Sequence, residues 1–366
     1  MPHAEIAGAG FAGLTAAIAL KSRGWSVRVH EAEEELRAFG AGIYIWENGL
    51  RVLRAIGAYD EVMIGLHTVG VMESRFDGKP GVLQRFGPEL GSRMVTMTRQ
   101  HLYAAILNSA RRHGIEIVTG SEVVRAELDG VLETKAGMRY SADLVIGADG
   151  VKSQVRDSAG FKVEREIYRD GITRLLVDRI PEEATDPDWN HVVDFWTKTP
   201  GPRRILYTPC NEKELYLAFM APRTDREVAQ VPINKHAWSE SFPYLSKIIA
   251  RVQMEGRYDL YQTSRVPSWS KGRVVLVGDC AHAMPPTLGQ GAGLAISNAL
   301  GLAVALQASP SIEYALRAWE KKERPLTDHT QNFASDLART RRLSEGHAWS
   351  DDALRAARHV PTGAAP

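Results

Sequence analysis

The sequence predicts an α/β fold in which a parallel sheet with flanking helices is interrupted by a largely antiparallel sheet and followed by C-terminal helices. Three observations predict it. The first 30 residues give strand, glycine-rich turn, helix and strand, the length of one βαβ unit. Residues 160–270 are rich in aromatics and Pro with alternating apolar and polar positions, which favours antiparallel strands. Residues 273–279 return to the apolar run of a buried parallel strand.

Length and charge narrow the classes of function. The 366 residues are enough for two closely packed domains. Lys and Arg number 45 against 44 Asp and Glu, so no overall field attracts nucleic acid or anionic lipid. The two cysteines, Cys210 and Cys280, have no metal-ligand spacing and are expected to be buried thiols. With no signal-peptide pattern and no apolar run of about 20 residues, we expect a cytoplasmic protein without membrane or nucleic-acid partners.

The individual elements follow from local patterns. The predicted strands are short runs of β-branched and aromatic residues, over 4–7, 25–30, 115–118, a small meander to 140, 142–150 and 273–279. The predicted helices have apolar residues at helical spacing, over 14–20, 48–56, 99–113, 235–251, 290–307 and 312–344. The last residues, 361–366, are small residues and Pro and are expected to fray.

The glycine-rich turn carries the first chemical signal. Gly8, Gly10 and Gly13 have the G-x-G-x-x-G spacing between a predicted strand and helix. In such a turn the first glycine permits the tight bend, the second lets the backbone approach a pyrophosphate, and the third lets helix and strand pack closely. Glu31, at the end of the second strand, can accept hydrogens from ribose hydroxyls and would repel a 2′-phosphate. A glycine-rich turn without ligand is the alternative, and FAD and NAD both remain open.

Two later segments favour FAD. Residues 278–282 end a buried strand, where the Asp279 carboxylate can bind a polyol hydroxyl. Residues 289–293 open the next helix with three glycines, and a helix N-terminus can stabilise the electron-rich edge of a reduced flavin. Residues 147–156 place Asp149 at another strand end near the same region.

Together the motifs resemble a known family. The glycine fingerprint, G-A-D-G-x-x-S-x-V-R at 147–156 and G-D-x-A-H-x-x-x-P-x-x-G-Q-G at 278–291 are similar to those of the single-component FAD-dependent aromatic hydroxylases, which include para-hydroxybenzoate hydroxylase. The resemblance implies a Rossmann-type FAD-binding domain. We expect this domain to comprise 1–70, 95–160 and 268–310, a substrate domain to comprise 71–94 and 161–267, and a C-terminal helical segment to comprise 311–366.

The resemblance adds cofactor positions to those read from the residues. Arg99 matches an arginine at a helix start that reaches the FAD phosphates or ribose, and Arg37 matches one near the adenosine side. The complete predicted cofactor set is Gly8, Gly10, Gly13, Glu31, Arg37, Arg99, Asp149, Asp279, Pro286, Gly291, Ala292 and Gly293.

Within the family, oxygenases of pyridine carboxylates share further segments with this chain, including 36–44, 204–207, 209–212 and 214–217. On that pattern the predicted substrate contacts are Arg174, Arg204, Tyr216, Tyr44 and Met72. A carboxylate substrate needs cationic partners, which the arginines supply. The alternatives are surface ion pairs for the arginines and a core position with a satisfied hydroxyl for Tyr216.

The resemblance also implies a reaction. FAD is reduced by NADH or NADPH and reacts with O₂, and the resulting flavin hydroperoxide attacks a small hydroxylated aromatic or N-heteroaromatic carboxylate. Whether the ring then opens is left undecided. Tyr216 and Tyr44 are predicted to orient the ring, and Pro286 to shape the wall beside the flavin. A flavin dehydrogenase or reductase, a non-catalytic flavin-binding protein, and either a monomer or a homo-oligomer remain open; no metal is expected.

Overall fold

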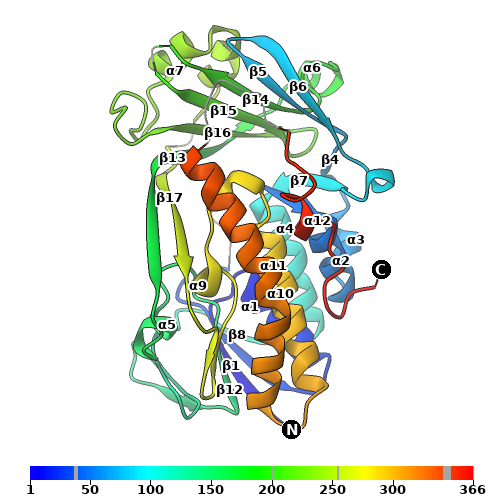
Figure 1. Cartoon of the computed structure of the whole chain (residues 1–366), viewed down its shortest axis with the longest axis vertical. Helices are drawn as coiled ribbons and strands as arrows, with labels where there is room; N and C mark the ends of the chain where they lie inside the picture. The colour runs from blue at the N-terminus through cyan, green and yellow to red at the C-terminus, as the bar shows by residue number, and fades with distance from the viewer. Residues whose placement is uncertain (37–39, 200, 254, 341–347, 366) are drawn as a thin grey trace.

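The computed structural model describes residues 1–36, 40–199, 201–253, 255–340 and 348–365. Figure 1 shows a body built on a parallel sheet with helices and, stacked above it along the long axis, a second sheet. The long helix α11 (Ile312–Thr340) runs from the lower body up to the second sheet. The predicted α/β architecture, with an inserted antiparallel sheet and C-terminal helices, is therefore confirmed.

The lower sheet has six strands in the order β18-β19-β12-β1-β2-β8. Its pairings are parallel except at the edge, where β18 runs antiparallel to β19. The strands are β1 (His3–Ala7), β2 (Ser26–His30), β8 (Glu116–Val118), β12 (Leu144–Gly147), β18 (Ser270–Lys271) and β19 (Val274–Leu276). β12 and β19 are buried along their whole length, as strands covered on both faces must be.

Helices and two small sheets complete the lower body. α1 packs against both α10 and α4, beside the sheet. The longer helices are α1 (Phe11–Lys21), α2 (Glu47–Ala55), α4 (Arg99–Arg112) and α10 (Gly291–Gln307). The small sheets are the predicted meander of β9 (Val123–Glu127), β10 (Val131–Thr134) and β11 (Arg139–Ser141), and the sheet of β3 (Gly42–Trp46), β4 (His67–Val69) and β7 (Met94–Thr98).

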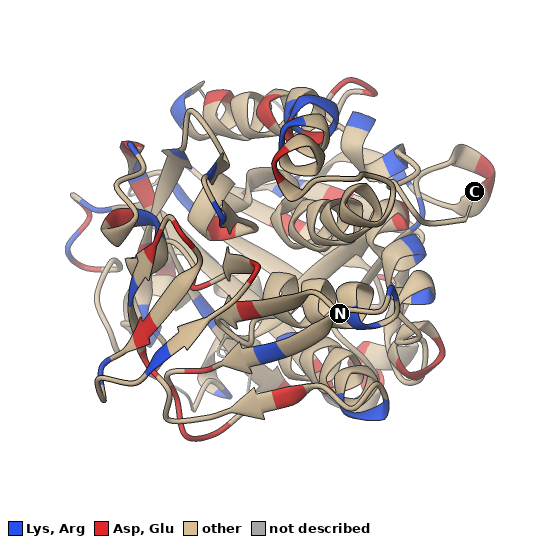
Figure 2. Ribbon diagram, turned by 90° about the horizontal axis from the view of Figure 1, so that it is seen from below, with Lys and Arg blue, Asp and Glu red and all other residues tan. Residues whose placement is uncertain are grey.

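The short helices lie at the ends of strands and loops. They are α3 (Tyr59–Val62), η1 (Pro88–Leu90), α5 (Gln154–Ser158), α6 (Pro181–Thr185), α9 (Asp279–His282), η3 (Pro286–Leu288) and α12 (Arg355–Arg358). None of the helices in the described ranges is both long and apolar enough to cross a membrane. Seen from below, basic and acidic residues are interspersed over this end of the molecule (Figure 2), in keeping with a formal net charge of +1.

The upper sheet has seven strands in the order β17-β13-β16-β15-β14-β5-β6. Only the β14–β5 pairing among them is parallel. The strands are β5 (Val71–Phe76), β6 (Lys79–Arg85), β13 (Glu164–Asp178), β14 (Val192–Thr197), β15 (Arg203–Pro209), β16 (Glu214–Pro222) and β17 (Tyr258–Arg265). The two segments predicted to form the substrate domain, 71–94 and 161–267, thus supply every strand of this sheet.

Side chains of the upper sheet alternate between two apolar layers. On β16, Leu215, Leu217 and Phe219 pack against α7 (Lys235–Ser241) and α8 (Ser246–Ala250). The intervening residues Tyr216 and Met220 belong to a different cluster on the opposite face, toward the lower body. The period of two along a strand therefore decides which residues can reach a site between the two layers.

Two local predictions were wrong. The single helix expected over 235–251 is broken into α7, the 3₁₀ turn η2 (Pro243–Leu245) and α8. Phe242 has φ −132° and ψ 70°, and a residue before proline is kept out of the helical region by the proline ring. Of the segment expected to fray, the described residues 361–365 are held in place: Pro361 is buried and the Thr362 hydroxyl donates a hydrogen bond to Glu323 at 2.7 Å.

Candidate functional site

A cavity of about 330 Å³ lies between the two layers. Its lower wall comes from the turns that follow β1, β12 and β19, and its upper wall from β13, β15, β16 and β17. The carboxyl ends of parallel strands are where open α/β sheets bind ligands. The predicted site residues that line it are Gly10, Arg99, Asp279, Pro286, Gly291 and Ala292 together with Tyr44, Arg174, Arg204 and Tyr216.

The other predicted residues lie outside this lining. Arg37 is outside the described residues. Met72, on β5, is 9% exposed and packs in the apolar cluster beneath the upper sheet. The remaining residues are Gly8, Gly13, Glu31, Asp149 and Gly293, which lie behind or beside the lower wall.

The glycine turn is held by steric necessity. Gly8 has φ +98°, and a Cβ there would lie 2.5 Å from the carbonyl oxygen of Ala148. A Cβ on Gly13 would lie 2.0 Å from the Gly8 carbonyl oxygen. A Cβ on Gly10, in contrast, would meet nothing within 4 Å. Gly8 and Gly13 therefore allow the turn to close, while Gly10 leaves room where a pyrophosphate would approach the backbone.

Glu31 borders this turn. Its Oε2 accepts a hydrogen bond from the backbone N–H of Ala9 at 2.9 Å, and its Oε1 accepts one from Glu33 at 3.1 Å. Each carboxylate oxygen can accept more than one hydrogen bond. The side chain is thus fixed in position and still able to accept the hydroxyl hydrogens of a ribose.

Two helix N-termini meet at the cavity. Neither α1 nor α10 has a side-chain cap or an acidic residue in its first turn, and both begin with residues of the cavity lining. Their first N–H groups lack intrahelical acceptors, and the helix dipole places positive partial charge there. This arrangement suits an anionic group at each end of one extended ligand.

Buried polar atoms on the lower side lack partners. The Nε of Arg99 and the Oδ1 of Asp149 are buried without a hydrogen-bond partner among the described residues. The Asp279 side chain is accessible from the cavity, yet desolvation by the surrounding protein raises its pKa, while the charges of Arg99 and Arg174 act in the opposite direction. Buried polar groups are normally paired, so these atoms indicate a polar ligand with phosphate and hydroxyl groups. The residues present fit FAD.

The end of the cavity toward the upper sheet carries two tyrosines, Tyr44 from β3 of the lower body and Tyr216 from β16. The Tyr44 hydroxyl, from β3, is hydrogen-bonded to the Thr208 hydroxyl. Tyr216 is 5% exposed, and a Cβ on Gly42 would lie 2.5 Å from its ring, so β3 passes directly against it. Desolvation raises the pKa of both phenols, that of Tyr44 well above its ordinary value. Both hydroxyls are therefore protonated near neutral pH and can donate hydrogen bonds.

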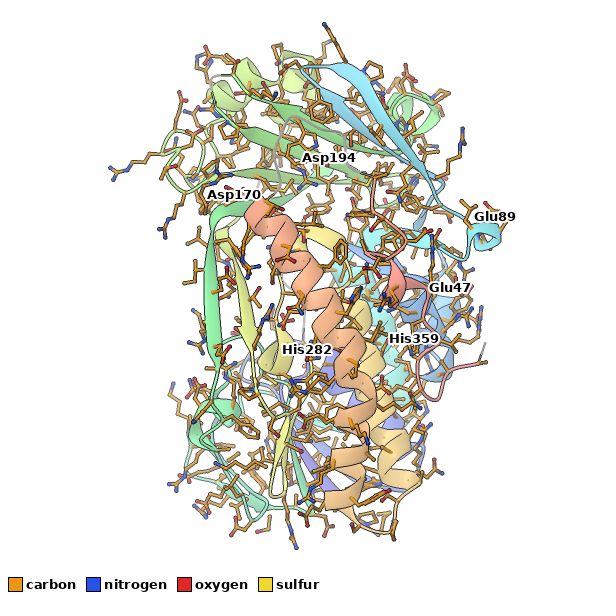
Figure 3. All side chains as sticks on the ribbon, in the orientation of Figure 1. Glu47, Glu89, Asp170, Asp194, His282 and His359 are labelled. Atoms are coloured by element: carbon orange, nitrogen blue, oxygen red, sulfur yellow. The ribbon has the colours of Figure 1, made fainter. Side chains whose placement is uncertain are left out.

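The two arginines differ in how they are paired. Arg204 is buried; its Nε donates to Asp194 at 2.5 Å, and its guanidinium lies 4.5 Å from the Trp196 ring centre. Burial acts to lower the pKa of Arg204, but Asp194 outweighs it and the pKa is raised. Arg174 is part-exposed and lies 3.4 Å from Asp259. Figure 3 shows Asp194 within the upper sheet, above the lower body.

Several lining residues were missed by the sequence analysis. Met220 is four residues beyond Tyr216 on β16, so the period of two would have placed both on one face. Tyr261 comes from β17, at the far edge of the sheet, where only the strand order reveals it. The other missed lining residues include Ile172, Leu206 and Met284. The prediction that Cys210 and Cys280 are buried is confirmed.

Comparisons with known proteins agree with this geometry. The family model described as FAD binding domain matches residues 3–312. A 2-heptyl-3-hydroxy-4(1H)-quinolone synthase of Mycobacteroides abscessus is 40% identical over 90% of this chain and 88% of its own length. The 3-amino-4-hydroxybenzoate 2-monooxygenase of Streptomyces cremeus is 30% identical over 94% of this chain and 86% of its own.

Solved structures extend the likeness to the whole chain. The tetrameric form of 2-methyl-3-hydroxypyridine-5-carboxylic acid oxygenase superposes with a TM-score of 0.95 and 47% identity, covering 100% of this chain and 98% of that one. The glycine turn, the two helix N-termini and the unpaired polar atoms thus lie in a fold whose relatives oxygenate aromatic rings. The chain belongs to the single-component, FAD-dependent aromatic monooxygenase family.

Proposed function

We propose that this monooxygenase uses NADH or NADPH and O₂ to oxygenate a small hydroxylated aromatic or N-heteroaromatic carboxylate. The observation that supports it most is a single cavity with the FAD-fitting residues on one wall and Tyr44, Tyr216, Arg174 and Arg204 on the other. A ring held between these walls would lie against the flavin.

When bound, FAD would supply the redox chemistry, accepting electrons from the pyridine nucleotide and activating O₂. The residues of this chain bind and orient the ring and exclude water. Tyr44 and Tyr216 donate hydrogen bonds from protonated phenols rather than removing protons. Pro286, in the loop before α10, closes the wall on the cofactor side. Exclusion of water matters because solvent access favours loss of H₂O₂ over oxygen transfer.

The arginines have unequal parts in this proposal. Arg204 is already compensated by Asp194, so a substrate carboxylate gains little from it. Arg174 has a longer, part-exposed pair with Asp259 and lines the cavity, which makes it the better partner for a carboxylate. Arg204 then helps to shape the end of the cavity.

A second candidate substrate is a neutral alkyl-substituted quinolone, the class in the name of the Mycobacteroides abscessus relative. The observation that favours it is the same compensated Arg204, because that end of the cavity can accept an uncharged ring without leaving a cation unpaired.

Incubation of the FAD-loaded protein under ¹⁸O₂ tests the proposal. The panel contains 3-hydroxypyridine carboxylates, hydroxybenzoates and 2-alkyl-4-quinolones, each with NADH and with NADPH. We expect at least one ring to gain ¹⁸O, and the product's structure distinguishes hydroxylation from ring opening. If all the reducing equivalents appear as H₂O₂ with every ring, the proposal is wrong.

Tyr216→Phe tests the orienting role. Loss of one hydrogen bond should raise KM or lower the fraction of NADH coupled to product by about 3–10-fold, without abolishing turnover. Tyr207→Phe is the matched control, because Tyr207 lies on the opposite face of the neighbouring strand and donates to the Trp189 carbonyl at 3.0 Å. Equal effects of the two substitutions on coupling would contradict the role of Tyr216.

A further inference from the structure

A second cavity of about 370 Å³ adjoins the one that holds the site. Arg204, Met220 and Tyr261 line both cavities and form the partition between them. The second cavity is lined by residues of β13 to β17 in the upper sheet and is bordered by Leu337 and Ala338 near the end of α11. Figure 3 shows Asp170, another of its lining residues, beside the upper end of α11.

The inner lining of this second cavity is mainly apolar. It includes Trp196, Pro202, Met220, Pro222, Leu337 and Ala338. Its arginines are compensated, Arg204 by Asp194 and Arg203 by Asp225 and Glu227, and its one lysine, Lys198, is exposed at the rim. Arg169 lies 2.7 Å from Asp170. An apolar group would enter such a space at least cost, because it displaces water from apolar walls and leaves those pairs intact.

The first cavity is too small to hold a long substituent of the substrate in addition to the two rings. The first cavity, about 330 Å³, has to contain the flavin ring as well as the substrate ring. Pockets for ligands of drug size occupy roughly 300–1,000 Å³, so a substituent of several carbons has no room beside both rings. Met220 is unbranched and adaptable, which suits a partition that a substituent must pass.

We propose that the second cavity receives an apolar alkyl substituent of the substrate while the substrate ring lies in the first. The inference rests on the proposed function for the position of the ring, and it specifies a substrate class: a hydroxylated heteroaromatic ring with a linear alkyl chain. The chain crosses at Met220 and Tyr261 and ends against Leu337 and Ala338.

Binding to the oxidised, FAD-loaded protein tests this without requiring turnover. The probes are 2-alkyl-4-quinolones with chains of one, three, five and seven carbons, titrated by the change in the flavin absorption spectrum. Burial of each methylene should tighten Kd by about fourfold until the cavity is full. A Kd that does not fall with chain length, or no binding by any homologue, overturns the inference.

A substitution outside the lining of the first cavity locates the chain. Ala338 lines only the second of these two cavities, so Ala338→Phe should fill it while leaving the ring site unchanged. We expect the seven-carbon homologue to lose at least tenfold in affinity and the one-carbon homologue less than twofold, with Ala338→Ser as the control of similar size. Equal losses for both homologues, or none for the longer one, would show that the chain lies elsewhere.

The two proposals fail in different ways. If the ¹⁸O₂ panel yields only H₂O₂ while affinity still rises with chain length and falls in Ala338→Phe, the second cavity stands and the oxygenation proposal does not. If a carboxylate ring without an alkyl chain is oxygenated efficiently and chain length has no effect on binding, the function stands and the second cavity does not take part.

Discussion

Replacing Asp194 with alanine should cost the FAD-loaded protein about 3 kcal/mol of unfolding free energy. The Arg204 and Asp194 side chains are 10% and 6% exposed, and their polar atoms lie 2.5 Å apart. Removing one partner of a buried pair typically costs about 3–5 kcal/mol, because the other charge is left uncompensated. The lower end of this range applies here, because the Trp196 ring still contacts the guanidinium and Arg204 lines cavities through which it can be solvated.

Urea denaturation followed by circular dichroism, at saturating FAD, measures this cost. The matched control is Asp259→Ala, which breaks two exposed pairs: with Arg174 at 3.4 Å, where the side chains are 34% and 29% exposed, and with Arg257 at 2.7 Å. Such a pair contributes about 0–1 kcal/mol. The double variant Asp194→Leu/Arg204→Met should recover most of the loss, because no lone charge remains. The reasoning is refuted if Asp194→Ala costs no more than Asp259→Ala.

Three further predictions follow from other regions. Gly13→Ala should prevent FAD binding by blocking the turn, whereas Gly10→Ala should fold normally yet lower the affinity for FAD by about tenfold or more. Flavin content reports binding and circular dichroism reports folding, so together they separate the two variants. Trp349→Ala removes the indole N–H bond to the Thr287 carbonyl in the loop before α10, so the H₂O₂ released per NADH should rise. Burial lowers the pKa of His282 to about 4 from 6.5, so the unfolded chain binds a proton more readily than the folded one, and up to about 3 kcal/mol of unfolding free energy is lost as the pH falls from 6.5 toward 4. His282→Asn should flatten this part of a profile of urea midpoint against pH. An unchanged profile would contradict the reasoning.

The cofactor side of the site could be predicted from sequence because its causes are local. The spacing of Gly8, Gly10 and Gly13 specifies one turn, and the structure shows the close contacts that require glycine at two of the three positions. Asp279 follows directly from the end of a buried strand. Each feature depends on residues within one strand, turn or helix, so no knowledge of long-range pairing was needed.

The substrate side depends on pairing that local patterns do not contain. Arg204 was expected to meet a substrate carboxylate, but the hairpin of β14 and β15 brings Asp194 close to it. The register places Trp196 directly opposite Arg204, which fixes the stacking as well. Register is set by the whole sheet, so neither partner of Arg204 could be read from its own segment.

The C-terminal residues show the same limit of local patterns. Small residues and Pro gave no periodic signal over 361–366, yet Pro361 is buried and the Thr362 hydroxyl donates to Glu323 of α11. Their order comes from contacts with helices and strands far away in sequence. Disorder could not be inferred from composition alone, because tertiary contacts can hold a terminal segment.

The cofactor side and the substrate side of the site differ in how freely their residues can be replaced. The cofactor side is constrained by the backbone, because a Cβ on Gly13 would lie only 2.0 Å from the Gly8 carbonyl oxygen, so few substitutions there are tolerated. The substrate side consists of side chains on one face of a sheet whose other face packs separately. Replacing Met220 or Tyr261 would therefore reshape the partition between the cavities without moving the FAD-binding turn. On the proposals made above, the lower body would hold the cofactor, and the upper sheet would select which ring, and which substituent, reaches it.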